Sequence, residues 1–242
     1  MPIRRIVRRM IDLPLRSKLV LSFLAIILFG GVLLFVIGTR IEHRTIISLA
    51  EAKVRHDLAS AWTVYEERGN ALRDTVRLSA TQEFLRSALR RESYESVAAR
   101  LDAVRRTFGL DVLSLADGSG RVVLRSRRPG AAAGDDVAGD PFVARALRGE
   151  ASAGTRIVSS EELLAEGEDL AERARFQFVP TPMAAVRPEY SEDRGMMLAA
   201  AAPIVDDAGG LLGVLYGGLL FNRNYDLVDR VKEIVFKGEK YK

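Results

Sequence analysis

The sequence contains no cysteine and only two histidines among its 242 residues. The absence of cysteine excludes disulfides, thiolate metal sites and cysteine nucleophiles. His43 and His56 lie on one predicted helix and are about 220° apart around its axis at ~3.6 residues per turn, so they cannot share a site within one chain. Neither a phosphate-binding loop nor a dinucleotide-binding glycine pattern is present. We therefore expect that this chain is not an enzyme.

Charge is nearly balanced over most of the chain. The formal net charge is +4, from 36 lysines and arginines and 32 acidic residues. Residues 1–18 hold six of the cations and one anion, so this end carries +5 and the remainder carries −1. A composition with 48% hydrophobic and 28% charged residues excludes a mainly disordered chain. Because an apolar run follows the basic cluster directly, we expect this cluster to face a lipid bilayer and predict no nucleic-acid partner.

The apolar run extends over residues 19–39, which are 21 consecutive uncharged residues. At ~1.5 Å per residue this length matches the ~30 Å hydrocarbon core of a bilayer. A cleaved signal peptide has a shorter apolar region of ~7–15 residues and a small-residue cleavage site, and a buried soluble helix usually has a polar face. We therefore expect a transmembrane helix over 19–39, with residues 1–18 in the cytoplasm by the positive-inside rule and the main domain outside it.

The residues that follow the predicted span favour helices. From residue 41 to about Arg90 there is no proline, and apolar residues recur at helical spacing. A second helix is expected from Ser93, as its N-cap, to Phe108, with Gly109 ending it. We therefore predict a long extracytoplasmic helical stalk over residues 40–108. An amphipathic helix of this length must pack on the later domain, on a copy of itself, or on both, so a homodimer is expected.

Residues 109–237 alternate between strand and helix patterns. Two β-rich runs flank Gly118–Gly120 and predict a hairpin. Pro141, Ala151–Ser159 and Ser160–Arg175 indicate a short helix, a strand and a further helix. The final strands, 196–205 and 211–222, form a second predicted hairpin, and a terminal helix is expected over 225–237. This order predicts an α+β lobe with a central antiparallel sheet.

Short sequence pieces in the last third of the chain carry a resemblance. They are Thr181-Pro182 with Pro188, Ala202-Pro203, GVLYGG (213–218), NRNY (222–225), Val228-Asp229 and GEKY (238–241). With the membrane helix and the long helix, they resemble the double-Cache sensory domain described as a Cache 3/Cache 2 fusion, over about residues 41–242. The resemblance implies a PAS-like (Cache) five-stranded antiparallel sheet with flanking helices, in the N-terminal part of a bacterial receptor of the inner (plasma) membrane.

Receptors of this kind also have a second Cache lobe, a second membrane helix and a cytoplasmic output module. The output module is most often a histidine kinase of a two-component system and sometimes a chemotaxis signalling domain. Residues 238–242 would begin the link to the second lobe, so we expect the chain to be the N-terminal sensory portion. The expected function is small-ligand sensing outside the cytoplasm and transmembrane signal transduction. The alternatives are a chemotaxis receptor fragment and a membrane-anchored scaffold or interaction protein.

Tyr216 is the first candidate ligand contact. It lies in the run GVLYGG, where glycines inside a strand often mark the close approach of a ligand or another backbone. Alternation along a strand places Tyr216 on the same face as Val214 and Leu212. Core packing, with the hydroxyl bonded to the backbone, is the alternative interpretation.

The other candidates are arginines and large apolar residues. Arg156, in a strand, and Arg175, near Phe178, could each hold an anionic ligand through the guanidinium fork, although most arginines are at the surface. Phe178 and Met197 complete the candidate set. Arg121 and Arg125 are predicted to share one strand face with Val123 and are weaker candidates.

An acidic cluster in the loop before Pro141 was considered as a metal site. Asp135, Asp136 and Asp140 could hold Ca²⁺, but their spacing differs from that of a calcium loop. A solvated loop in which Asp140 caps the following helix explains them. We therefore expect no metal and no cofactor.

Overall fold

The computed structural model describes residues 14–130, 134–179, 181–182, 191–225, 229 and 232–233, with residues 38–47 and 49–50 as backbone only. The chain divides into two compact units, Met1–Ala59 and Ser60–Lys242. Most of the predicted terminal helix (225–237), the predicted link (238–242) and residues 1–13 lie outside the described residues.

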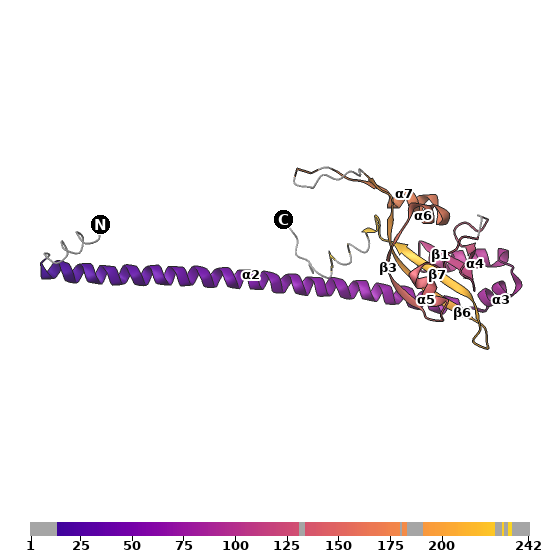
Figure 1. Ribbon diagram of the computed structural model, residues 1–242, viewed down its shortest axis with the longest axis horizontal. Coiled ribbons are helices and arrows are strands. Elements are labelled where there is room, and N and C mark those ends of the chain that lie inside the picture. Colours follow the sequence, from indigo (N-terminus) through magenta and orange to yellow (C-terminus); the bar gives the residue numbers. More distant parts are fainter. Residues whose placement is uncertain are drawn as a thin grey trace. The chain divides into compact units, whose positions relative to one another are not determined.

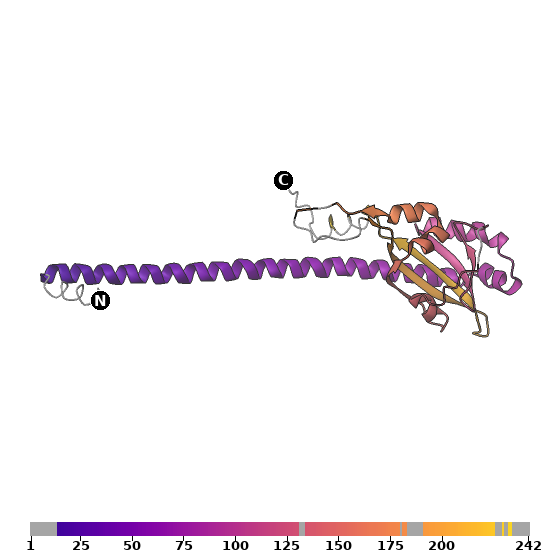
Figure 2. The same ribbon diagram turned by 45° about the horizontal axis from the view of Figure 1, so that its top comes forward.

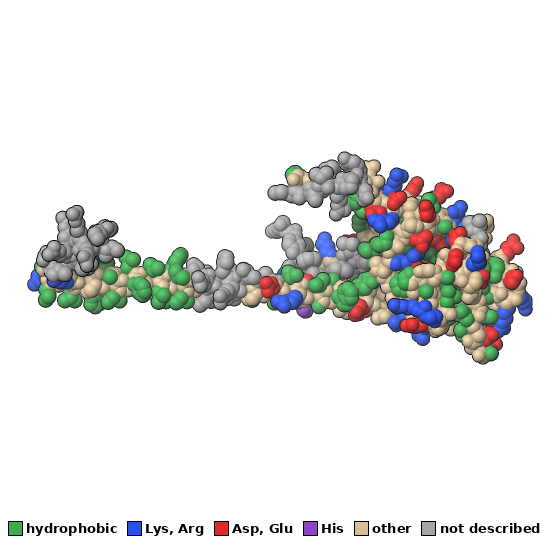
Figure 3. All heavy atoms as spheres, viewed as in Figure 1, with side chains coloured by type: hydrophobic (Ala, Val, Ile, Leu, Met, Phe, Trp, Pro, Cys, Tyr) green, Lys and Arg blue, Asp and Glu red, His purple; other side chains and the backbone are tan. Residues whose placement is uncertain are grey.

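The helix α2 runs without interruption from Leu15 to Ala80 (Figure 1). Its segment Leu15–Ile37 is long and apolar enough to cross a membrane. The large apolar side chains of this segment are exposed, and hydrophobic side chains cover the same part of the helix in Figure 3. Such a surface is unfavourable in water and matches a hydrocarbon environment. The apolar helix predicted over 19–39 is therefore confirmed as a helix.

The helical region after the apolar segment differs in detail from the prediction. The long helix was expected to reach Arg90, but α2 ends at Ala80 and α3 (Glu83–Arg91) follows. The break lets α3 bury Leu85 and Ala88 in the core. Helix α4 (Glu95–Thr107) is capped by Tyr94 and not by the predicted Ser93, and no side-chain capping bond forms there.

A five-stranded antiparallel sheet forms the centre of the second unit, in the order β2-β1-β7-β6-β3 (Figures 1 and 2). Its strands are β1 (Val112–Asp117), β2 (Val122–Arg125), β3 (Ser152–Val158), β6 (Gly195–Val205) and β7 (Leu211–Leu220). Both predicted hairpins are present, as β1–β2 and β6–β7. The predicted α+β class and five-stranded antiparallel sheet are confirmed.

Each face of the sheet has its own hydrophobic core. On one face, the end of α2 packs with α3 and α4 through residues such as Val76, Leu85 and Leu101. On the other face, α5 (Pro141–Ala146), α6 (Ser160–Glu166) and α7 (Glu168–Ala174) cover the sheet. Burying each large aliphatic side chain contributes about 1.5–3 kcal/mol. The sheet therefore separates the end of α2 from the helices that follow β2.

Two β-bulges change which residues share a face. In β2 the register shifts so that Leu115 opposes Leu124 while Ala116 opposes Val122, which leaves Val123 as the extra residue. An extra residue reverses the alternation of side chains beyond it. The prediction that Arg125 shares a face with Val123 is therefore wrong.

The second bulge lies at the start of β7. Ile204 opposes Gly213 while Val205 opposes Leu211, so Leu212 is the extra residue. Leu212 packs in the core formed with α2, α3 and α4, whereas Val214 and Tyr216 belong to the core on the opposite face of the sheet. The prediction that Leu212 shares a face with Tyr216 is wrong for the same reason.

The segment after β3 contains two helices in place of the single one predicted over 160–175. Gly167 separates α6 from α7. A small two-stranded sheet, β4 (Phe176–Gln177) with β5 (Ser191–Glu192), follows and was not predicted. Between β4 and β5, residues 180 and 183–190 lie outside the described residues.

Candidate ligand-binding cavity

A cavity of about 530 Å³ lies on the sheet face covered by α5 and α6. The strands β1, β3, β6 and β7 contribute its floor, including Met197 and Tyr216. Helices α5 and α6 and the loop residues 135–140 contribute its walls. Ligand pockets in proteins usually occupy about 300–1,000 Å³ and combine apolar walls with a few polar groups. The volume is therefore suited to a small organic molecule.

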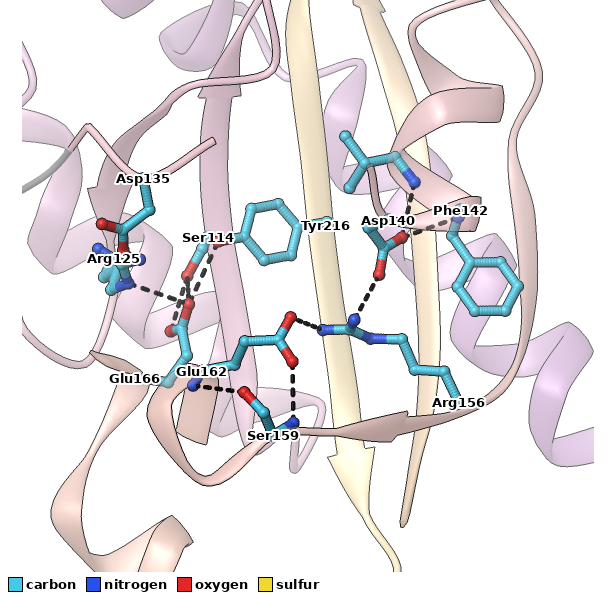
Figure 4. A network of polar contacts seen from close by, with 11 residues as sticks. Ser114, Arg125, Asp135, Asp140, Phe142, Arg156, Ser159, Glu162, Glu166 and Tyr216 are labelled. Carbon is cyan, nitrogen blue, oxygen red and sulfur yellow. Dashed lines mark hydrogen bonds and ion pairs between the residues drawn. The ribbon is translucent and has the colours of Figure 1, made fainter. Parts of the chain in front are cut away.

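Two networks of polar side chains adjoin the cavity (Figure 4). The first, the Glu166 network, consists of Ser114, Arg125, Asp135, Glu166 and Tyr216. The Glu166 carboxylate accepts hydrogen bonds from the Ser114 hydroxyl at 2.9 Å, the Arg125 Nε at 3.2 Å and the Tyr216 hydroxyl at 3.2 Å. Arg125 also forms an ion pair with Asp135. Arg125 is 5% exposed and Glu166 is 7% exposed. Buried charges of this kind are tolerated because each has an opposite charge and hydrogen bonds.

The strand register brings the Glu166 network together. Ser114 in β1 lies opposite Arg125 in β2 and opposite Tyr216 in β7, so the three residues form one row across the sheet. Glu166 is the last residue of α6, and Figure 4 shows its carboxylate next to Ser114 and Arg125 of that row. Residues that are far apart in sequence thus meet at one end of the cavity.

The environment shifts the pKa of two members of this network. Burial raises the pKa of the Glu166 carboxyl above its usual value, although Arg125 and Ser114 act in the opposite direction. Burial and the neighbouring Glu166 raise the pKa of the Tyr216 hydroxyl well above its usual value. Tyr216 therefore stays protonated, and its hydroxyl donates a hydrogen bond to the Glu166 carboxylate.

The second polar network, the Arg156 network, consists of Asp140, Arg156, Ser159 and Glu162. Arg156 donates to Asp140 Oδ2 at 2.9 Å and to Glu162 Oε1 at 3.0 Å. The Tyr216 ring lies between this network and Ser114 in Figure 4. Although burial opposes it, the Ser159 backbone N–H and the Arg156 charge lower the pKa of Glu162 below its usual value.

Local helix capping holds the two carboxylates of the Arg156 network in place. Asp140 accepts hydrogen bonds from the backbone N–H groups of Phe142 and Val143, as predicted for the N-cap of α5. Ser159 and Glu162 form a capping box at the start of α6. Both carboxylates therefore stabilise a helix end and an arginine at the same time.

The structure brings three of the five candidate residues to this cavity. Tyr216, Arg156 and Met197 line it. Arg175 follows the last residue of α7, and Phe178 lies beyond β4, where its ring is 5.4 Å from that of Phe176. Neither Arg175 nor Phe178 lines the cavity, because after α7 the chain forms the β4–β5 pair, which is separate from the five-stranded sheet.

Two buried charges of the cavity, Arg125 and Glu166, are not among the five candidate residues, and Arg125 was named only as a weaker candidate. Arg125 was placed on the wrong strand face, because no residue type marks the bulge at Val123. The single helix predicted over 160–175 gives Glu166 no special position, whereas in the structure it is the last residue of α6. Gly167, which follows it, was the available signal, since glycine often ends a helix.

The glycines around Tyr216 make room for neighbouring chain segments. A Cβ at Gly217 would lie 2.8 Å from the carbonyl oxygen of Val112, and one at Gly218 would lie 2.6 Å from the Met197 sulfur. Glycine in this strand was expected to allow the close approach of either a ligand or another part of the chain. At Gly217 and Gly218 it is other parts of the chain that approach closely. Met197 consequently lies against the strand and forms part of the cavity floor.

The acidic residues before α5 are accounted for by protein contacts. Asp140 caps α5, and Asp135 pairs with Arg125. Among the residues that the structure describes, no group of three or more histidine, aspartate or glutamate side chains could hold a metal ion.

Three solved structures illustrate what the chain is similar to. The sensor domain of the Vibrio cholerae histidine kinase DctB matches at a TM-score of 0.50 and 13% identity, over 78% of this chain and 60% of that one. The Escherichia coli DcuS sensor domain matches at a TM-score of 0.44 and 16% identity, over 69% of this chain and 98% of that domain. The periplasmic domain of V. cholerae LuxQ matches at a TM-score of 0.45 and 13% identity, over 75% of this chain and 70% of that domain.

No protein-family model and no curated protein matches the chain. The likeness to the DctB sensor domain shows that the chain has a sensor-domain fold, as the resemblance to Cache domains predicts. The chain spans three fifths of that domain.

Proposed function

We propose that this chain is the extracytoplasmic sensing portion of a membrane receptor and binds a small ligand in the cavity lined by Tyr216 and Arg156. The observation that carries the proposal is the cavity of about 530 Å³, which combines two polar networks with apolar lining residues, in a sensor-domain fold. The proposed role is binding and signalling, without catalysis by this chain.

The strand β3 offers a route from the cavity to α2. Consecutive residues of a strand point to opposite faces, so Arg156 faces the cavity while Thr155 faces the other side. The Thr155 hydroxyl is hydrogen-bonded to the Tyr65 hydroxyl of α2 at 2.7 Å. A ligand that changes the position of Arg156 would therefore also act on α2, and would shift the population of two packings of this helix on the sheet.

The proposal places α2 in the bacterial inner membrane, with residues 1–18 in the cytoplasm and the sheet domain in the periplasm or outside the cell. The exposed apolar segment Leu15–Ile37 and the preceding basic cluster support this orientation. Val54, Leu58 and Trp62 are exposed at intervals of four residues along α2. Such a stripe supports a homodimer through this helix.

The output of the receptor is proposed to be a two-component histidine kinase, with a chemotaxis receptor as the second candidate. The fold likeness to a histidine kinase sensor domain favours the first. The coding sequence after the Lys242 codon tests this choice. A kinase core supports the first output and a long methylatable coiled coil supports the second, whereas a stop codon favours a membrane-anchored scaffold.

Ligand binding is tested with the full chain in detergent micelles, by isothermal titration against carboxylates, amino acids and amines. We expect at least one compound to bind with 1:1 stoichiometry. Ala199 lines the cavity and is 7% exposed, so Ala199→Leu should fill part of the space and weaken binding about tenfold or more. Ala208→Leu, in the exposed β6–β7 turn, is the control. A binder that is unaffected by Ala199→Leu would place the ligand elsewhere.

A further inference from the structure

The cavity has few cationic groups to offer a ligand. Among the described lining residues, Arg125 and Arg156 are the only cationic side chains. Arg156 is held between Asp140 and Glu162, and Arg125 between Asp135 and Glu166. Each guanidinium therefore already has two carboxylate partners. A carboxylate or phosphate ligand would have to displace one of them.

The carboxylates outnumber the guanidiniums in the same lining. Six acidic side chains line the cavity, and they are Asp135, Asp136, Asp140, Glu161, Glu162 and Glu166. With two arginines against them, the lining carries a net negative charge even if one buried carboxyl is protonated. Charges a few ångströms apart interact more strongly in a protein cavity than in water, because the effective dielectric constant there is lower. The lining therefore favours the entry of a cation over that of an anion.

A cation can also bind without breaking any existing contact. A carboxylate has about four lone-pair sites. The Glu162 carboxylate uses Oε1 for Arg156 and Oε2 for the Ser159 backbone N–H and remains able to accept further hydrogen bonds. An ammonium group brings three donors and no acceptor, which is the complement of this arrangement.

The rest of the cavity suits a hydrocarbon group. Phe142 and Val143 of α5, Leu163 of α6 and Met197 of β6 supply apolar lining. The Phe142 ring lies over β3 at Gly154, where an added Cβ would be 3.0 Å from it. Apolar side chains from α5, α6 and β6 thus line the same cavity as the Arg156 network.

We propose that the cavity takes a small ligand with a protonated amine on a hydrocarbon body, and that the carboxylates of Glu162 and Asp140 hold the amine. This inference rests on the proposed ligand-sensing function and specifies its ligand class. Arg156 acts in it as a charge that orients these carboxylates and competes with the ligand for them.

Matched probes that differ only in charge test the ligand class. The full chain in detergent micelles is titrated with hexylamine, hexanoate and hexanol, and with 2-phenylethylamine, 3-phenylpropionate and 3-phenylpropanol. We expect an amine to bind at least about tenfold more tightly than the carboxylate and the alcohol of its series, and the difference to shrink with added salt. Tighter binding of the carboxylates would overturn the ligand class and leave the sensing function intact. If no probe and no compound of the wider titration binds, the sensing function itself fails.

The variant Arg156→Gln distinguishes a cationic from an anionic ligand, because it should change their binding affinities in opposite directions. Removing the competing cation frees Asp140 and Glu162, so amine binding should tighten about threefold or more. A ligand held by Arg156 would instead bind more weakly. Glu162→Gln keeps an acceptor for the capping box and removes the charge, so amine binding should weaken about tenfold or more.

The exposed Glu168 lies outside the cavity lining, and Glu168→Gln is the matched control. It should leave amine binding unchanged. Thermal melts of all variants distinguish a change in binding from loss of the fold. Weaker amine binding in Arg156→Gln, with an unchanged melting temperature, would contradict the proposed role of Arg156.

Discussion

Glu166 is a carboxylate with little access to water and three different donors around it. Ser114, Arg125 and Tyr216 each donate a hydrogen bond to it. Leaving a buried donor without its acceptor is unfavourable by about 1–3 kcal/mol. Glu166 therefore fixes three side chains that come from three neighbouring strands of the sheet.

The raised pKa of Glu166 gives a testable pH dependence of stability. The folded chain keeps a proton that the unfolded chain releases near pH 4.5, so the stability contributed by this group falls as pH rises from there through the folded-state pKa. Glu166→Gln cannot ionise, so it should gain stability relative to the native chain over that range, by about 1.4 kcal/mol per unit of pKa elevation. Urea denaturation followed by circular dichroism from pH 4 to 8 measures the difference.

Gln at position 166 can retain the hydrogen bonds of the network, because its amide oxygen accepts from Tyr216 and its amide nitrogen can donate to Ser114. Any effect should therefore come from the charge. Glu168→Gln, on the exposed side of α7, is the control and should show no such pH dependence. A stability difference that moves in the opposite direction would mean that Arg125 outweighs burial and lowers the Glu166 pKa.

At the scale of elements, β3 and α6 connect the parts of the site. β3 is the strand at one edge of the sheet and carries Arg156, while α6 begins with Ser159 as its cap and ends with Glu166. One short helix thus supplies Glu162 to the Arg156 network and Glu166 to the other network. The start and the end of α6 must both be held for the cavity to keep its shape.

Removal of the α6 cap should weaken the fold by a predictable amount. The Ser159 hydroxyl accepts a hydrogen bond from the Glu162 backbone N–H at 3.2 Å. Replacing such a cap by alanine lowers the free energy of unfolding by about 1 kcal/mol. Ser159→Ala should show this loss in urea denaturation.

Ser93 provides the control for the cap, because it is exposed and does not cap α4. Ser93→Ala should change the free energy of unfolding by less than about 0.5 kcal/mol. Equal losses in the two variants would show that capping by Ser159 does not stabilise α6.

The whole molecule combines a helix segment suited to a membrane with a sheet domain that contains the cavity, so its orientation in a membrane can be tested. The first unit contains the exposed apolar helix segment, and the second contains the sheet and the cavity. The proposed function requires the two ends of the apolar segment to lie on opposite sides of the bilayer.

The absence of cysteine allows a clean test of this orientation. Single cysteines at Ser93→Cys and Pro2→Cys can be labelled with a membrane-impermeant maleimide in intact spheroplasts. We expect labelling at position 93 and protection at position 2, because the basic residues 1–18 should remain in the cytoplasm. Permeabilised spheroplasts should label at both positions. Labelling at position 2 alone in intact spheroplasts would reverse the proposed topology.

Elements with local signals could be predicted from the amino-acid sequence. The uncharged run 19–39 predicted an apolar helix, the glycines at 118 and 120 predicted a hairpin, and Asp140 before Pro141 predicted a helix cap. Each of these depends on hydrophobic length, turn geometry or capping within a few residues, so no distant contact was needed to find it.

The sequence pointed to Tyr216, Arg156 and Met197, but the tertiary structure was needed to place Arg125 and Glu166 in the same site. The bulge at Val123 turned Arg125 to the cavity face, and the end of α6 at Gly167 placed Glu166 within hydrogen-bond distance of Ser114 and Tyr216. A bulge arises from pairing between strands, and a shift of one residue moves a side chain to the opposite face. The faces of strands were therefore decided by contacts between distant segments, which the alternation of residues along one strand does not record.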